Sequence, residues 1–350
     1  MTLTADTLDT TRVPFTARGP LSEAVISHLS GFRHAARTAH TDLARLVLDT
    51  STDVLHDDDI QLTLFALYAS AYGSITAFDP RLEWDPRAIA TRTILEEAFE
   101  RAIRDAVTMP PLPEVSQDAI ARALFHLAGA EDGPSLSRYV ARKATDPQVR
   151  EFLIQRSIYT LREADPHSWA IPRLHGRAKA AIVEIQSDEY GGGRPDRVHA
   201  AIFAASMRGA GLDDTYGRYV DDVPAITLAS HNMMSMFGLN RRLLGAIVGH
   251  LAAFEMTSSI PNRLYGDGLR RLGYGPEVTD YFDEHVEADA VHEQIASRDL
   301  AGALGEDRPD LLPDIMFGAA ACLTVDSMVG AHMLERWSAG QSSLRQRRAA

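Results

Sequence analysis

The chain has 350 residues, of which 45% are hydrophobic, so it can bury a sizeable core as one large domain or two smaller ones. Its 48 acidic and 35 basic side chains give a formal net charge of −13, which argues against a nucleic-acid partner. The single cysteine, Cys322, excludes an internal disulfide and fits a cytoplasmic protein, and no segment approaches the roughly 20 apolar residues of a membrane span.

Apolar residues at helical spacing dominate the chain, and alternating patterns of β-branched residues are scarce, which predicts an all-α protein. Pro86 stands close to the start of the third predicted helix, where its missing N–H costs little. The spacing predicts helices over residues 22–48, 58–71, 85–107, 116–127, 135–144, 148–162, 172–189, 196–208, 241–256, 261–272, 276–296 and 309–337.

Composition suggests where the domains begin and end. Residues 1–18, rich in threonine and aspartate, are expected to be disordered, and residues 341–350 are expected to form a flexible tail. The loop 108–113 contains three prolines and breaks the helical pattern. It either separates two domains or is a turn within one. We divide the ordered chain into an N-terminal helical region, 19–145, and a bundle, 146–340.

One helical face in the C-terminal third carries His285, Asp289 and His292. Each residue of an α-helix advances by about 100°, so positions i, i+4 and i+7 fall within roughly 60° of each other. Two imidazoles and a carboxylate therefore point the same way, as metal ligands do in helical bundles. We predict that all three residues bind metal.

A second pair of candidates flanks the glycines at residues 191–193. In a continuous helix Glu189 and His199 would diverge by about 80°, but the glycines allow the backbone to turn so that both side chains face one metal. Asp196 stands three residues before His199 and is a candidate ligand or a hydrogen-bond acceptor for its imidazole N–H. A surface acid and a core histidine are the structural alternative.

Two more carboxylates complete the candidate set. Glu255 closes an apolar helix that has no other acid, and a buried, unpaired charge there would cost several kcal/mol unless a cation compensated it. Glu163 lies in the turn after the helix predicted over 148–162 and is a possible extra ligand. A solvated helix end is the alternative for Glu255, and an ordinary turn residue is the alternative for Glu163. Mixed imidazole and carboxylate donors suit iron, or else manganese, better than metals that prefer thiolates.

The sequence resembles the haem-oxygenase-like diiron oxidases, also described as iron-containing redox enzymes, over about residues 162–296. The resemblance rests on several blocks in order: EIQSDEYGGG at 184–193, His199, Glu255, GLRRLG at 268–273 and HVEADAVH at 285–292. It implies a haem-oxygenase-like seven-helix bundle that binds two irons and no haem, with an N-terminal helical extension that larger members use for packing and dimerisation. The implied ligands are Glu189, His199, Glu255, His285, Asp289 and His292, with Glu163 as the additional carboxylate of N-oxygenating relatives.

These inferences predict an oxidoreductase that activates O2 to oxidise a small amine- or amino-acid-derived substrate, by N-oxygenation or by oxidative C–C or C–H cleavage. The expected partners are O2, an external reductant and a second copy of the chain in a homodimer. Arg270, Arg271 or Tyr190 could anchor a substrate carboxylate, or else have structural roles. A metal-independent oxidase on the same fold and a non-catalytic helical binding protein are the alternatives. The expected partition of ligands is Glu189, His199 and His292 on one iron and Glu255, His285 and Asp289 on the other.

Overall fold

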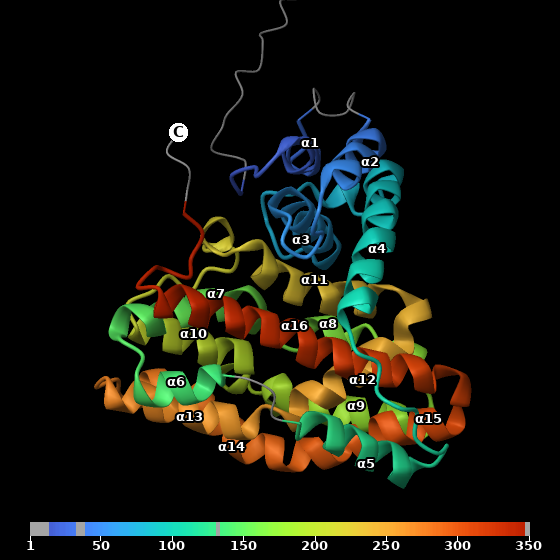
Figure 1. The fold of residues 1–350 in the computed structure, drawn as a ribbon, viewed down its shortest axis with the longest axis vertical. Coiled ribbons are helices and arrows are strands. Elements are labelled where there is room, and N and C mark those ends of the chain that lie inside the picture. Colours follow the sequence, from blue (N-terminus) through green and yellow to red (C-terminus); the bar gives the residue numbers. More distant parts are fainter. Residues whose placement is uncertain (1–13, 33–38, 131–133, 347–350) are drawn as a thin grey trace, which may run out of the picture. The chain divides into compact units, whose positions relative to one another are not determined.

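The computed structural model describes residues 14–32, 39–130 and 134–346, with the backbone alone for residues 287–290. Within these ranges the chain forms helices and no strand, which confirms the prediction of an all-α protein (Figure 1). It divides into two compact units, Met1–Phe99 and Glu100–Ala350.

The first unit contains two helices, α1 (Pro20–Leu29) and α2 (His40–Thr50), where one long helix was predicted. Its other elements are α3 (Asp58–Tyr72), η3 (Pro80–Leu82) and most of α4 (Pro86–Ala106). The prediction of one helix over 22–48 is wrong because α1 ends at Leu29, and Gly31 then takes a left-handed backbone conformation with φ 81°. Residues 33–38, which join α1 to α2, lie outside the described part of the chain.

The segment 14–18 is ordered, although we expected disorder there. Phe15 is buried and makes edge-to-face contacts with Phe65 and Phe78, at ring-centroid distances of 5.7 and 6.2 Å. Arg18 Nη1 donates a hydrogen bond to Asp58 Oδ1 at 2.8 Å. A buried aromatic ring and an ion pair therefore attach this segment to the first unit, and residues 1–13 lie outside the described chain.

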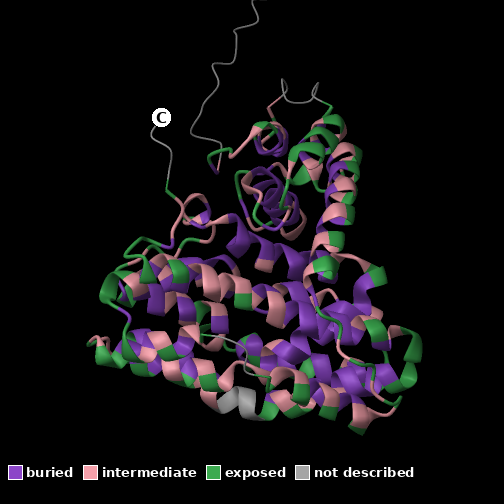
Figure 2. Cartoon of the chain, viewed as in Figure 1, coloured by how far each residue is buried: buried purple, intermediate pink, exposed green. Residues whose placement is uncertain are grey.

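The second unit is a bundle of packed helices, with buried residues lining the faces that meet (Figure 2). Its first part consists of α5 (Gln117–Ala128), α6 (Leu136–Arg142), α7 (Asp146–Thr160), α8 (Asp165–Ser168), η4 (Ile171–Arg173), α9 (Gly176–Glu189), η5 (Gly191–Gly193), η6 (Pro195–Arg197), α10 (His199–Gly209) and η7 (Val220–Asp222). Its second part consists of α11 (Ala225–Leu239), η8 (Arg241–Leu243), α12 (Leu244–Met256), α13 (Ser259–Arg271), α14 (Pro276–Gln294), the π-helix η9 (Ile295–Gly302), α15 (Ala303–Asp307), η10 (Pro309–Leu311) and α16 (Leu312–Ser338).

The helices α5 and α6 belong to the second unit. The helix α5 packs on η9, and α6 packs on α13, beside which it lies in Figure 1. For this reason the division between the units falls at residues 99 and 100, inside α4, and not at residue 145, where the sequence analysis placed it. The proline-rich loop 108–113 is then a connection within the second unit.

The pair α12 and α16 forms the closest helix packing in the second unit. A Cβ atom on Gly249 would lie 1.9 Å from the Ile315 carbonyl oxygen, and one on Gly318 would lie 2.0 Å from the Ala246 carbonyl oxygen. Glycine at these positions is what allows the two backbones to touch. This contact fixes α12, which carries Glu255, against the rest of the bundle.

Contrary to expectation, the helix Pro309–Ser338 is long and apolar enough to span a membrane, with a mean hydropathy of 1.4 over an 18-residue window. More than half of that window, 56%, is buried inside the protein. A helix in the core of a bundle passes the same test of length and composition, so the observation is weak support for a membrane span.

Residues 341–346, which we expected to be flexible, pack against α7. Ser343 is fully buried, and both its backbone N–H and its hydroxyl donate to Glu151 Oε2, at 2.8 and 2.7 Å. Gln155 Nε2 donates to the same hydroxyl at 2.9 Å. Satisfied buried hydrogen bonds therefore order this segment, and residues 347–350 lie outside the described chain.

Candidate metal centre

Six predicted ligands converge inside the second unit, and each is no more than 6% exposed. Four of them lie at or near the ends of different helices, and two lie on α14. Glu163 follows α7, Glu189 is the last residue of α9, His199 is the first residue of α10, Glu255 lies near the end of α12, and His285 and His292 lie on α14.

The turn between α9 and α10 requires glycine. Gly191 has φ 74°, and a Cβ atom on it would lie 2.7 Å from the backbone of Arg197 and Val198. Only glycine can take this conformation and allow this approach. The turn reverses the chain, so that Glu189 Oε2 lies 2.9 Å from His199 Nδ1. The two side chains face each other, as the glycines led us to expect.

The candidate ligands form two groups that share Glu189. In the first group, Glu189 lies with Glu163, His199 and His285, and one donor atom from each residue lies within 4.8 Å of the others. In the second group, Glu189 lies with Glu255 and His292 at the same spacing. Two adjacent metal positions with a common carboxylate would account for this arrangement. We refer to the six residues together as the metal cluster.

Hydrogen bonds fix which imidazole nitrogen of each α14 histidine faces the cluster. His285 Nδ1 lies 2.7 Å from the Tyr281 carbonyl oxygen, which can only accept, so Nδ1 carries the proton and the Nε2 lone pair faces Glu163 at 3.7 Å. His292 Nε2 lies 3.1 Å from Asp188 Oδ2 and its Nδ1 lies 3.4 Å from Glu255 Oε2. A second partner that orients the ring is typical of metal-binding histidines.

The cluster contains three buried carboxylates, those of Glu163, Glu189 and Glu255, and their negative charge has to be compensated. Burial raises the pKa of Glu189, and together with the Glu163 and Glu255 carboxylates it outweighs His199, which lowers this pKa. Burial lowers the pKa of His292, but Glu255 and Asp188 outweigh this effect and raise the pKa to about 9. Like charges gathered in a buried space are unfavourable unless protons or cations compensate them.

The donor atoms of the cluster fit a metal ion. Three of them, Glu189 Oε2, His199 Nδ1 and His292 Nδ1, are buried and form no hydrogen bond of good geometry among the described residues, although each lies within 3.4 Å of another donor atom of the cluster. Buried polar atoms are rarely left in this state, and a bound metal would satisfy them. Imidazole and carboxylate donors suit iron and manganese. The buried histidine and glutamate side chains therefore suggest iron binding.

The grouping differs from the partition expected from the sequence. His285 lies with His199 and Glu163, whereas we placed it on one iron with Glu255. The side chain of Asp289 lies outside the described residues. Asp196 is exposed in η6, and the carboxylate beside His199 is that of Glu189.

Other residues around the cluster were not predicted. Asp188, whose side chain is exposed, contacts His292. The Tyr281 hydroxyl lies 2.8 Å from both oxygens of Glu163 and donates to that carboxylate. Ala164, directly after Glu163, has φ 72° and is the sole non-glycine residue with a positive φ in the described chain. Such strain, about 1–3 kcal/mol, often marks a functional site.

Two of the proposed substrate anchors have structural roles. Arg270 forms ion pairs with Asp267 and Asp283. Arg271 donates to the carbonyl oxygens that end α6, those of Val140 and Ala144 among them. A third, Tyr190, has its hydroxyl within hydrogen-bonding distance of Asp165 and Ser168.

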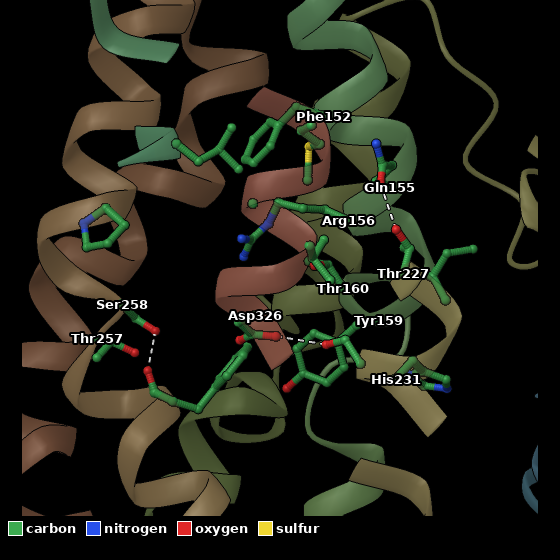
Figure 3. Close-up of a pocket in the computed structure, with 18 of the residues that line it drawn as sticks. Phe152, Gln155, Arg156, Tyr159, Thr160, Thr227, His231, Thr257, Ser258 and Asp326 are labelled. Atoms are coloured by element: carbon green, nitrogen blue, oxygen red, sulfur yellow. Dashed lines mark hydrogen bonds between the residues drawn. The ribbon is translucent and has the colours of Figure 1, made fainter. Parts of the chain in front are cut away.

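A cavity of about 350 Å³ lies beside the metal cluster (Figure 3). Side chains of α7, α11, α13 and α16 line most of it. Tyr159, Phe254 and Ser258 line both this cavity and the small space around the cluster. The Tyr159 and Phe254 rings pack edge to face at 5.3 Å between centroids. A ligand in the large cavity would therefore reach the cluster past these three residues.

Three buried histidines near this region predict a loss of stability in acid. Burial lowers the pKa of His167 to about 3 and that of His231 to about 4, and it lowers the pKa of His250 well below its usual value. The folded protein keeps them neutral, while the unfolded chain takes up protons below its pKa of about 6.5. Stability is therefore present above pH 6.5 and is lost as the pH falls, by about 2 kcal/mol per histidine at pH 5.

Urea unfolding of the metal-free protein at pH 8 and pH 5 measures this loss. A His231→Gln variant should show a smaller difference between the two pH values, by about 2 kcal/mol. Replacement of the exposed His126 with glutamine should leave the difference unchanged. An unchanged pH difference in folded His231→Gln protein would contradict the assignment of a neutral, buried His231.

An all-α bundle with a buried cluster of histidines and carboxylates is the architecture of bundle-type metal-dependent oxidative enzymes. Residues 150–327 match the family of iron-containing redox enzymes. The chain therefore belongs to that family, is an oxidative enzyme and has a haem-oxygenase-like helical bundle, as the sequence predicted. It is also 28% identical, over 205 residues, to nitrosourea synthase from Streptomyces achromogenes subsp. streptozoticus. That match covers 58% of this chain and 43% of the relative.

Proposed function

We propose that this enzyme is a non-haem diiron oxidoreductase that uses O2 to oxidise a small amine- or amino-acid-derived substrate. The observation that carries the proposal is that Glu189 belongs to both groups of candidate ligands. One iron would be held by Glu163, His199 and His285, the other by Glu255 and His292, with Glu189 between them. When bound, the two irons supply the electrons that reduce O2.

The protein's own residues orient these ligands and limit access of water. Tyr281 donates to Glu163, and Asp188 accepts from His292, so neither side chain is free to rotate away. The space around the cluster has a volume of only about 10 Å³. The ring pair of Tyr159 and Phe254 separates it from the large cavity. The substrate then arrives from one side, and its reacting atom is held next to the metal positions.

Of the reactions considered, N-oxygenation has the better support. The matched relative is named a nitrosourea synthase, and a nitrosourea carries an oxidised nitrogen. The buried Glu163 supports the same choice, because the extra carboxylate expected of N-oxygenating relatives falls at this position. Electrons would come from an external reductant.

Anaerobic titration of metal-free protein with ferrous iron tests the proposal. We expect uptake of about two irons per chain and, on addition of O2, a transient visible absorption that reports oxidation of the iron-loaded protein. A His285→Ala variant should lose one iron and turnover. A variant that still binds two irons and turns over would contradict the ligand assignment, and O2 consumption without any metal would favour a metal-independent oxidase.

A further inference from the structure

The large cavity contains two side chains of opposite charge that do not pair with each other. Arg156 reaches into it from α7 and Asp326 from α16 (Figure 3). No carboxylate of the described chain lies within 4.0 Å of the Arg156 guanidinium nitrogens. Opposite charges that line one cavity without an ion pair leave both available to a ligand.

Arg156 has no carboxylate partner in the described chain, and one of its donor atoms makes no hydrogen bond. Its Nε is buried with no hydrogen-bond partner among the described residues. Its neighbours are the Phe152 and Tyr265 rings, whose centroids lie 5.6 and 5.8 Å away, and the Tyr281 hydroxyl. A planar cation held against aromatic rings, with donors directed into a cavity, is a preferred site for a carboxylate.

Asp326 is held in place and directed at the same cavity. The Ser230 hydroxyl donates to its Oδ1 at 2.8 Å. This bond satisfies part of the acceptor capacity of the carboxylate and leaves the rest for a cationic ligand group. Burial raises the pKa of Asp326, so a cation beside it would favour the ionised form.

Two neutral side chains of the cavity each have a buried polar atom without a hydrogen bond among the described residues. Asn262 is 3% exposed and Thr160 is 1% exposed, and both line the cavity. The Oδ1 atom of Asn262 and the hydroxyl of Thr160 have no hydrogen-bond partner within the described part of the chain. Buried polar atoms in this state indicate a ligand that forms hydrogen bonds with the cavity wall.

We propose that the large cavity binds an α-amino acid, with its carboxylate on Arg156 and its ammonium group on Asp326. The side chain of the amino acid would pass Tyr159 and Phe254 towards the metal cluster. Both charges of the cavity are then neutralised by one zwitterion. The part of the proposal that concerns oxidation rests on the diiron function proposed above, whereas the binding itself needs no metal.

Binding to the metal-free protein provides the test. The twenty proteinogenic L-amino acids are screened by thermal shift, and the Kd of the best ligand is measured by calorimetry beside its decarboxylated and its deaminated analogue. For lysine these are cadaverine and 6-aminohexanoate. We expect each analogue to bind about tenfold or more weakly, since each leaves one buried charge unpaired.

Variants test whether Arg156 binds the carboxylate of the amino acid and Asp326 binds its ammonium group. Arg156→Met should remove the preference for the amino acid over its decarboxylated analogue, and Arg156→Lys should retain part of it. Asp326→Asn should remove the preference over the deaminated analogue. Arg150→Met, on the same helix as Arg156, and Glu335→Gln, exposed on α16, are matched controls that should keep both preferences. Circular dichroism confirms that each variant is folded.

The outcomes separate this proposal from the diiron function. Failure of all twenty amino acids to bind, or unchanged preferences in folded Arg156→Met and Asp326→Asn proteins, would overturn the zwitterion site. If iron loading occurs without these preferences, the diiron function stands and the zwitterion site fails. If the preferences are found in a protein that takes up no iron, the zwitterion site stands and the diiron function fails.

Discussion

Replacement of Glu189 with glutamine is expected to remove iron from both positions, because Glu189 is the one residue that the two groups of ligands share. Loss of a residue that merely orients a ligand already costs about 10–100-fold in metal affinity, so loss of a shared ligand should cost more than about 100-fold in turnover. Iron analysis after anaerobic loading, together with O2 consumption, measures the effect. The side chain keeps its size, so a folding defect is not expected.

Two variants show whether the effect is specific to the shared carboxylate. Glu184→Gln changes an exposed residue of the same helix and should leave iron content and turnover unchanged. His292→Ala should remove iron from the second position only, since the first retains Glu163, His199 and His285. If Glu189→Gln protein still binds two irons, or if His292→Ala loses both, Glu189 does not link two metal positions.

The sequence predicted which residues of α14 face the cluster but not which metal position each one serves. The i, i+4, i+7 rule reports direction around a helix, and His285 and His292 do face the same buried region. It does not report distance along the axis, which is about 10 Å for seven residues. Two histidines that far apart serve different positions, as their separation into two groups indicates.

Residues that approach the cluster from other segments were harder to predict. The glycines after α9 indicated that Glu189 and His199 would meet, because a local turn brings them together. Asp188, by contrast, contacts His292 from a position more than 100 residues away in the chain, at 3.1 Å. Periodicity within one helix contains no information on such a contact. The same is true of Tyr281 and Glu163.

The helices that were missed or merged also have physical explanations. The sequence analysis predicted no helix over α11, almost every residue of which is buried. A helix that is apolar on all sides lacks the amphipathic period from which helices are recognised. The opposite error merged α1 and α2, because a helical pattern of apolar residues continues across the break near Gly31. The spacing of apolar residues in the sequence identified the amphipathic helices well and the fully buried helix α11 poorly.

Replacement of Gly249 with alanine is expected to destabilise the second unit by about 3 kcal/mol, since its Cβ would lie 1.9 Å from the Ile315 carbonyl oxygen. Intrinsic helix propensity predicts the opposite sign, a gain of about 1 kcal/mol. Backbone atoms of α16 cannot move aside as a flexible side chain can, so packing should outweigh propensity. Thermal unfolding should show a fall in Tm of roughly 6–12 °C.

Because Glu255 lies on the same helix as Gly249, a displaced α12 should also weaken iron binding at the second position more than at the first. Gly330→Ala is the matched control, since Gly330 lies within α16 and its Cβ would meet Leu136 at an ordinary 3.7 Å. That variant should be as stable as the wild type or up to about 1 kcal/mol more stable. If the two variants have the same stability, close approach of the α12 and α16 backbones does not hold Glu255 in the metal cluster.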